Sequence, residues 1–250
     1  MGALISRIAA LALAALVVAR SPPDPASVGN PASGLRTIEV GTGGRPVLLL
    51  HGYSSAPAEW LPFTVTLMSG TDTRFVFPEG MTKGARGTGR AWWPLDLSSH
   101  VSGTGLPDLT RTRPQGLADA AARVRTLLGE VTTRLGGRRE DLVLGGFSQG
   151  AMVSAEVAFR SDVPLRALVL LSPTVIDEPS WRQGLSARRG LRVFVAHGRQ
   201  DDVLSFALTS RWAETMRTAG LDVTWVPFDG KHEIPSSVVE ALNAFLGKAP

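Results

Sequence analysis

The sequence predicts an α/β protein whose mostly parallel central sheet has helices on both faces. The chain of 250 residues is 44% hydrophobic and 19% charged, which is typical of a compact domain and not of a disordered or fibrous chain. Short β-rich runs alternate along it with longer runs of helical periodicity. Several of the short runs are continuously apolar, as strands that are buried on both faces must be.

Each predicted element follows from its local pattern. The runs that predict strands are Arg36–Val40, Pro46–Leu50, Arg74–Phe77, Leu142–Gly145, Ala167–Leu171, Arg192–Ala196 and Val223–Val226. The segments with helical spacing of apolar residues are Glu59–Met68, Gln115–Leu135, Gln149–Arg160, Ser205–Ala219 and Ser236–Leu246. Pro235 precedes the last of them and suits the start of a helix.

The N-terminal segment, residues 1–19, resembles a secretory leader. It carries one charge, Arg7, followed by an apolar run from Ile8 to Ala19, and its Val17-x-Ala19 end resembles a signal-peptidase site. This run is shorter than the roughly 20 apolar residues that cross a bilayer. We therefore expect a signal peptide and an exported protein, periplasmic or secreted. The alternative is an uncleaved membrane anchor, which would bring the protein into contact with the membrane through its N-terminus.

The segment between this leader and the folded domain predicts a linker. Residues 20–34 are rich in Pro, Ser and Gly and show no apolar periodicity, which is typical of an extended tether. The folded domain is therefore expected over residues 35–250, as one unit with a single large core.

Charge and composition exclude several classes of function. The net charge of +4 comes from 26 basic residues spread among 22 acidic ones, with no basic run of the kind that binds nucleic acid. The chain has no Cys, which excludes disulfides, thiolate zinc sites and a Cys nucleophile. No group of His, Asp and Glu has metal-ligand spacing, and there is no phosphate-binding loop. We therefore expect no nucleic acid partner, no metal and no cofactor.

The strongest chemical signal is the motif Gly146-Phe147-Ser148-Gln149-Gly150. It follows a predicted strand and precedes a predicted helix, which is the context in which G-x-S-x-G forms a nucleophile elbow. A sharp turn lifts the serine hydroxyl out of the backbone, and Gly146 and Gly150 avoid side-chain clashes across it. Ser148 is therefore the candidate nucleophile. The alternative is a glycine-rich turn with a capping serine.

An acid and a base are expected downstream of this serine, in that order. Asp201 leaves the predicted strand Arg192–Ala196 at the edge of the sheet where the elbow opens, and it is the candidate acid. Its neighbour Asp202 could exchange roles with it, and a helix N-cap is the structural alternative for Asp201.

The candidate base is His232. It lies in a glycine-containing loop after the last predicted strand. Of the other histidines, His51 lies upstream of the elbow, His100 lies in a Ser/Gly-rich loop, and His197 shares a tight turn with the acid. A solvent-exposed loop histidine is the alternative for His232.

Two further features lie outside this predicted triad. The backbone amides of Tyr53 and Gln149 are candidates for the oxyanion hole, because one follows an early central strand and the other opens the helix after the elbow. Trp92 and Trp93 are candidates for the wall of a substrate pocket, in a long segment between two predicted elements. Alternatively, both tryptophans pack at the edge of the hydrophobic core and close it.

With these residues placed, the chain resembles the α/β-hydrolase superfamily, in particular the phospholipase/carboxylesterase family that includes acyl-protein thioesterases. The resemblance covers about Pro46 to Leu246 and rests on the motifs LLLHGY, GFSQGAM, HGRQD and GKHEI. It implies the α/β-hydrolase fold, a triad of Ser148, Asp201 and His232, and oxyanion residues Tyr53 and Gln149. The chain departs from the family pattern at Asp202, where Pro is usual.

The sequence therefore predicts a serine esterase that cleaves carboxylic esters of small or lipid-like molecules through an acyl-enzyme, like carboxylesterases and lysophospholipases. A thioesterase, an acyltransferase or a serine peptidase could use the same triad, and a catalytically silent binding protein could use the same fold. Acyl specificity and oligomeric state are not predicted.

The leader generates the first testable prediction. Expressed with its own N-terminus in a bacterial host, the protein should appear outside the cytoplasm, because an uncleaved apolar run ahead of a linker would stay exposed. Edman sequencing should then begin at or near Arg20. Full-length protein in the membrane fraction would show an anchor instead. A soluble cytosolic protein that begins at Met1 or Gly2 would contradict both interpretations.

Overall fold

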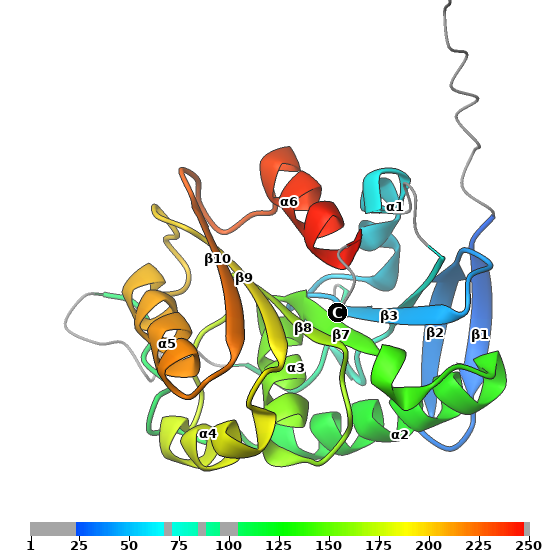
Figure 1. Cartoon of the computed structure of the whole chain (residues 1–250), viewed down its shortest axis with the longest axis horizontal. Coiled ribbons are helices and arrows are strands. Elements are labelled where there is room, and N and C mark those ends of the chain that lie inside the picture. The colour runs from blue at the N-terminus through cyan, green and yellow to red at the C-terminus, as the bar shows by residue number, and fades with distance from the viewer. Residues whose placement is uncertain (1–23, 68–71, 85–88, 96–104, 248–250) are drawn as a thin grey trace, which may run out of the picture.

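The structure is a computed structural model that describes residues 24–67, 72–84, 89–95 and 105–247. Its centre is an eight-stranded sheet with helices on both faces (Figure 1). The strands of this sheet are β1 (Ala26–Asn30), β2 (Leu35–Val40), β3 (Arg45–Leu50), β4 (Thr73–Pro78), β7 (Val143–Phe147), β8 (Ala167–Leu171), β9 (Arg192–Gly198) and β10 (Asp222–Phe228). A separate two-stranded ribbon joins β5 (Thr82–Lys83) to β6 (Arg90–Ala91).

The order of strands across the sheet is β1-β2-β4-β3-β7-β8-β9-β10. From β4 to β10 every neighbouring pair is parallel, whereas β2 is antiparallel to both of its neighbours. Parallel strands end at a common edge, so the loops after β3, β7, β9 and β10 meet at the carboxyl edge of the sheet. This is the edge at which open α/β sheets bind their ligands.

Helices cover the two faces of the sheet unequally (Figure 1). The α-helices are α1 (Leu61–Leu67), α2 (Leu117–Leu135), α3 (Gln149–Arg160), α4 (Glu178–Leu185), α5 (Phe206–Thr218) and α6 (Ser236–Gly247). α1 and α6 pack on one face, over the core cluster that includes Phe75 and Phe194. α2, α3, α4 and α5 supply the larger cluster on the other face. The sheet is thus buried on both sides, as its apolar strands require.

The predicted fold class is confirmed, and so is each predicted strand and helix, with boundaries that shift by a few residues. The predicted helix Glu59–Met68 begins as a 3-10 turn, η1 (Pro57–Trp60), before α1. Met68 lies outside the described residues. α4 was not predicted, because its short pattern is interrupted by Pro179 and Gly184.

The predicted linker over residues 20–34 is wrong for its second half. Ala26–Asn30 form β1, which pairs with β2 in an antiparallel hairpin. The N–H groups of Ala32 and Ser33 in the hairpin turn donate to the carboxylate of Glu130 on α2, at 2.7 and 3.0 Å. Backbone pairing and this carboxylate fix the segment, while most side chains of β1 are exposed. An apolar pattern was therefore never present to predict the strand. The predicted leader lies outside the described residues.

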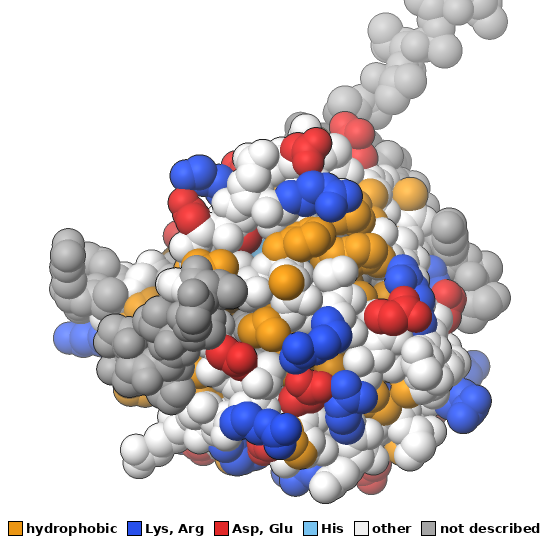
Figure 2. Space-filling view, turned by 90° about the vertical axis from the view of Figure 1, so that its left-hand side faces the viewer, with side chains coloured by type: hydrophobic (Ala, Val, Ile, Leu, Met, Phe, Trp, Pro, Cys, Tyr) orange, Lys and Arg blue, Asp and Glu red, His pale blue; other side chains and the backbone are white. Residues whose placement is uncertain are grey.

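Aromatic packing and ion pairs hold α4 and α5 together. The rings of Trp181 on α4 and Trp212 on α5 lie 5.9 Å apart, and Phe159 of α3 contacts both. On the surface above them, Glu178 pairs with Arg182 at 2.6 Å and with Arg211 at 3.1 Å. Figure 2 shows charges of both signs mixed with small hydrophobic patches on the face that α5 occupies. Exposed ion pairs stabilise little, so the buried aromatic cluster is the main contact.

Within the described part of the chain, no helix is both long enough and apolar enough to cross a membrane.

Candidate active site

Ser148 lies on the tight turn between β7 and α3. Its backbone angles, φ 53° and ψ −118°, are rarely adopted by residues with a side chain. Two backbone hydrogen bonds hold the turn in place. The N–H of Ser148 donates to the carbonyl of Leu171 at 2.8 Å, and the carbonyl of Ser148 accepts from the N–H of Met152 at 3.1 Å. The turn thus holds Ser148 at the carboxyl edge of the sheet, at the N-terminus of α3.

The two glycines of this elbow allow it to lie directly against the backbone of β3. A Cβ at Gly146 would come within 2.6 Å of the carbonyl oxygen of Leu50. A Cβ at Gly150 would collide with the same oxygen. Side chains at either position would therefore push the elbow away from β3. On the other side of the turn, a Cβ at Gly52 would lie 3.5 Å from the Cβ of Ser148, so the loop after β3 lies beside the serine.

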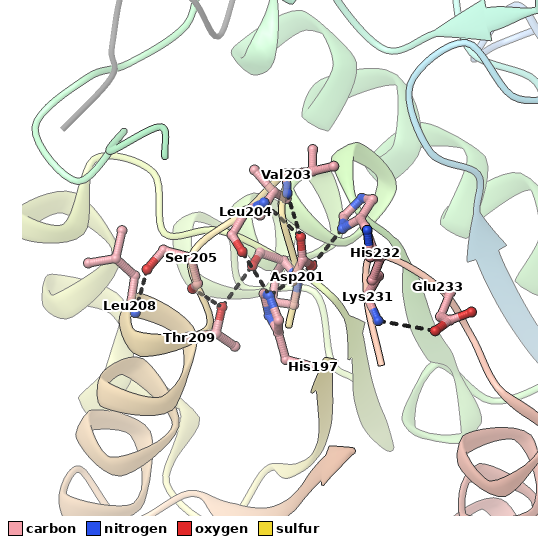
Figure 3. Close-up of polar contacts among 11 residues, drawn as sticks. His197, Asp201, Val203, Leu204, Ser205, Leu208, Thr209, Lys231, His232 and Glu233 are labelled. Atoms are coloured by element: carbon pink, nitrogen blue, oxygen red, sulfur yellow. Dashed lines mark hydrogen bonds and ion pairs between the residues drawn. The ribbon is translucent and has the colours of Figure 1, made fainter. Parts of the chain in front are cut away.

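Asp201 and His232 come together at the same edge, from the loops after β9 and β10 (Figure 3). Nδ1 of His232 lies 2.7 Å from Oδ2 of Asp201. The other carboxylate oxygen, Oδ1, accepts from the amides of Val203 and Leu204 at 2.9 and 2.8 Å. The ring of His232 lies 4.7 Å from that of Phe147, the residue before Ser148. The predicted acid and base thus form a hydrogen-bonded pair beside the elbow.

Hydrogen bonding keeps the carboxyl of Asp201 ionised. Burial alone would raise its pKa, because it disfavours the charged form. Hydrogen bonds from His197, His232 and the amide of Leu204 outweigh burial and hold the pKa of Asp201 well below its usual range. The carboxylate is therefore negative at neutral pH and can orient an imidazole that donates to it.

The neighbouring acid, Asp202, points the other way. It is exposed, and its Oδ2 accepts from Nζ of Lys231 at 2.8 Å. This contact joins the loop that carries Asp201 to the loop that carries His232, on their solvent side. The structure thus distinguishes the two acids, since Asp201 faces His232 and Asp202 faces Lys231.

The loop after β3 is fixed by a buried histidine, His51. Nε2 of His51 accepts from the N–H of Gly80 at 2.9 Å, so the proton is on Nδ1, which donates to the carbonyl of Gly52 at 2.7 Å. Burial lowers the pKa of His51, which keeps the ring neutral. In a trans peptide the N–H points opposite to the carbonyl, so the N–H of Tyr53 points away from His51. The ring of Tyr53 is half-buried.

Gln149 has a second role that the sequence did not indicate. Its side chain is fully buried, and its Oε1 accepts from the N–H of Trp92 while its Nε2 donates to the carbonyl of Trp93, both at 2.9 Å. Nε1 of Trp92 donates to the carbonyl of His51 at 3.0 Å. Both indoles are buried, and neither lines the pocket beside His232. A place for them in the wall of a substrate pocket stays a prediction.

A cavity of about 420 Å³ opens beside His232. Its walls are mostly apolar, and they carry two carboxylates. They come from the loop after β3, η1, α1, the elbow and the loop after β10. The lining residues are His51, Gly52, Ser55, Glu59, Trp60, Pro62, Phe63, Phe147, His232, Glu233 and Ile234. This size and polarity are typical of a small-molecule site.

Among the described residues no three His, Asp or Glu side chains are grouped as metal ligands.

The residue at this site that sequence reasoning missed is His197. Its Nε2 lies 3.0 Å from Oδ2 of Asp201, the same oxygen that His232 contacts. Its spacing of four residues from Asp201 was the available signal. The tight turn that it shares with Asp201 excludes His197 as the base but allows it to contact the carboxylate.

The strand order, the elbow and the pair of side chains at the carboxyl edge define the α/β-hydrolase class. The chain belongs to the phospholipase/carboxylesterase family, whose model matches residues 44–249. It is therefore a hydrolase of the carboxylesterase and thioesterase type.

Individual relatives fit this family. Acyl-protein thioesterase 1 of Yarrowia lipolytica is 26% identical over 195 residues, which cover 74% of this chain and 78% of that protein. The crystal structure of esterase PE8 is 25% identical, with a TM-score of 0.70 over 89% of this chain and 96% of its own. A carboxylesterase from Mesorhizobium loti is 16% identical with a TM-score of 0.72, over 89% and 99% of the two chains, and it supports the fold alone.

The bridge made by Gln149 generates a stability prediction. Gln149→Met keeps the shape of the side chain but leaves the N–H of Trp92 and the carbonyl of Trp93 buried without partners. Each such group costs about 1–3 kcal/mol, so the free energy of unfolding in urea should fall by about 2–6 kcal/mol. Gln183→Met, at an exposed position of α4, is the control and should change it by less than about 0.5 kcal/mol. Equal effects would contradict the bridge.

Proposed function

We propose that this protein is a serine esterase in which Ser148 is the nucleophile, His232 the general base and Asp201 the acid that orients it. The observation that carries the proposal is the 2.7 Å contact between His232 Nδ1 and Asp201 Oδ2, formed beside a serine in a strained strand-to-helix turn. A carboxylate bound to Nδ1 fixes the tautomer with its lone pair on Nε2, the nitrogen that takes a proton from a serine hydroxyl.

The reaction then runs in two halves. Ser148 Oγ attacks the ester carbonyl while His232 Nε2 accepts its proton, and the imidazolium that forms is stabilised by ionised Asp201. The same proton passes to the leaving alkoxide as the acyl-enzyme forms. Water, activated by His232, next attacks the acyl-enzyme, which releases the carboxylic acid and restores Ser148.

Two backbone amides would stabilise the oxyanion of each tetrahedral intermediate. Gln149 is the first residue of α3, so its N–H has no partner within the helix and lies at the positive end of the helix dipole. The N–H of Tyr53 belongs to the loop that passes beside Ser148, and His51 fixes the peptide that carries it. Such donors contribute most when they are held in place before the reaction begins.

The cavity supports an ester with an apolar acyl group. Trp60, Phe63 and Ile234 supply aromatic and aliphatic walls near His232. The same triad would cleave a thioester, because the acyl-enzyme is identical and only the leaving atom differs. The relative from Yarrowia lipolytica bears the name of an acyl-protein thioesterase, which favours the thioester as a second candidate. Matched p-nitrophenyl esters and acyl thioesters of increasing chain length, compared by kcat/KM, test the two.

The nucleophile gives a direct prediction. A fluorophosphonate probe should add once to each chain, on the peptide that contains Ser148, as mass spectrometry can show. Ser148→Ala should lose the label and at least about 10⁴-fold in kcat, because little beyond the oxyanion hole and binding then remains. Ser154→Ala is the control, since this serine lies on α3 and bonds to the carbonyl of Gly150. Labelling at another serine would contradict the proposal.

The two adjacent acids give the next prediction. Asp201→Asn should lower kcat by about 10⁴-fold, because an amide no longer holds the imidazole in the required tautomer. Asp202→Asn is the matched control and should cost about tenfold or less, since Asp202 contacts only exposed Lys231. Steady-state kinetics on both variants measure the difference. The reverse ranking would move the acid to position 202.

A further inference from the structure

The catalytic carboxylate proposed above has two histidine neighbours and not one. His197, at the end of β9, is completely buried, and its Nε2 lies 3.0 Å from Oδ2 of Asp201. His232 Nδ1 reaches the same oxygen at 2.7 Å from the other side (Figure 3). Only His232 is partly exposed toward the pocket, with 15% of its side chain accessible.

The surroundings of His197 determine where its proton lies. Nε2 faces two acceptors, Asp201 Oδ2 and the carbonyl of Leu204 at 3.2 Å. Nδ1 is buried without a hydrogen-bond partner among the described residues. A proton on Nδ1 would leave one buried donor unpaired and point a lone pair at two acceptors. Nε2 therefore carries the proton that Asp201 and the carbonyl of Leu204 accept, in contrast to His51, where the proton lies on Nδ1.

The backbone and the ring of His197 are also held in place. It belongs to β9, which is paired on both sides by β8 and β10, and its ring packs edge-on against Phe206 at 6.0 Å. His232, by contrast, lies in a loop. Asp201 thus receives two amides on Oδ1, one rigid imidazole on Oδ2 and one loop imidazole on Oδ2.

We propose that His197 is a positioning residue that holds the carboxylate of Asp201 in place as a permanent hydrogen-bond donor and shares Oδ2 with His232. This inference rests on the proposed function, because it assigns His197 to the same triad. The second donor offsets part of the negative charge on Oδ2. Without it, Oδ2 would attract the protonated ring of His232 more strongly, and the carboxylate would be free to rotate.

Other charged and titratable groups lie on the loops and on the pocket wall around this cluster. They are Asp202 and Lys231, which pair with each other, Glu233, which accepts from the N–H of Lys231, Arg199 and Asp229, which lie 3.5 Å apart, and His51 and Glu59 on the pocket wall. All of them stay the same when only His197 is changed. A difference between variants at position 197 therefore reports on the donor.

Two substitutions of similar shape isolate that donor. His197→Gln keeps an N–H near the position of Nε2, whereas His197→Met fills similar space without one. Fluorophosphonate titration of active sites corrects both variants for the folded fraction. His197→Met should lower kcat by about 10- to 100-fold with KM within about twofold, because a hydrogen bond to a charged group is lost. His197→Gln should restore kcat to within about threefold of the original chain.

The pH profile separates positioning from mere structural support. In His197→Met the acid limb of kcat/KM should move to higher pH, by about half a unit or more, because protonated His232 becomes more favoured. In His197→Gln it should stay in place. If both variants lose the same factor after active-site correction, with the acid limb unmoved, the inference is overturned.

A measurement on the original chain decides the matter if neither variant folds. With ¹⁵N-labelled histidine, the signals of His197 should show a proton on Nε2 at every pH at which the enzyme is active, and a ring without a proton on Nε2 would overturn the inference. The proposed function fails separately, if the original chain neither reacts with the fluorophosphonate nor cleaves esters or thioesters. An active original chain with equivalent Met and Gln variants would overturn only the role of His197.

Discussion

The backbone of Ser148 is held in a conformation that a residue with a side chain rarely adopts, and the centre of the molecule is built to hold it there. Such a conformation costs about 1–3 kcal/mol and persists only when its surroundings fix it. Here β8 bonds to the amide of Ser148, and every residue of α3 from Gln149 to Phe159 is buried. Gly146 and Gly150 bring the turn against β3, so the strain is confined between three strands and a buried helix.

Buried carboxylates around this centre are satisfied in different ways. Glu156 on α3 bonds to Arg113 at 2.6 Å and to Nε1 of Trp181 at 2.7 Å, and it joins α3 to α4 and to the segment before α2. Such a pair contributes little net stability, because the cost of desolvating the charges offsets much of their attraction. Asp201 instead accepts from two backbone amides on Oδ1 and two histidine rings on Oδ2. The two environments suit a structural tie and a reactive pair respectively.

The fold of this chain is shared at low sequence identity. Solved structures that are 16% and 25% identical share it over 89% of this chain, so the fold as a whole tolerates extensive substitution. The pocket walls come mostly from η1, α1 and the loops after β3 and β10, and Phe147 of β7 completes them. Asp202 makes an ion pair to Lys231 that links two of the loops at the site. The shape of this pocket therefore depends on loops and short helices as well as on the sheet.

The sequence by itself determined how strands and helices alternate along the chain, because apolar runs and helical periodicity reflect which side chains of each element are buried. It also predicted that Ser148, Asp201 and His232 each follow a strand and lie at one edge of the sheet. The glycines of the elbow and the ends of the strands can be recognised from the local sequence. It did not predict β1, because that strand has no apolar pattern of its own. Backbone pairing with β2 and a carboxylate from α2 hold it in place.

Only the tertiary structure decided what depends on contacts between distant segments. It turned Asp201 toward His232 and Asp202 toward Lys231, although the two acids are adjacent in sequence. It brought the backbone of Trp92 and Trp93 into hydrogen bonds with the side chain of Gln149. It also brought His197 into contact with the carboxylate of Asp201. A sequence states which donors and acceptors exist, but their pairing is fixed by which backbone segments the sheet brings within 3 Å of one another.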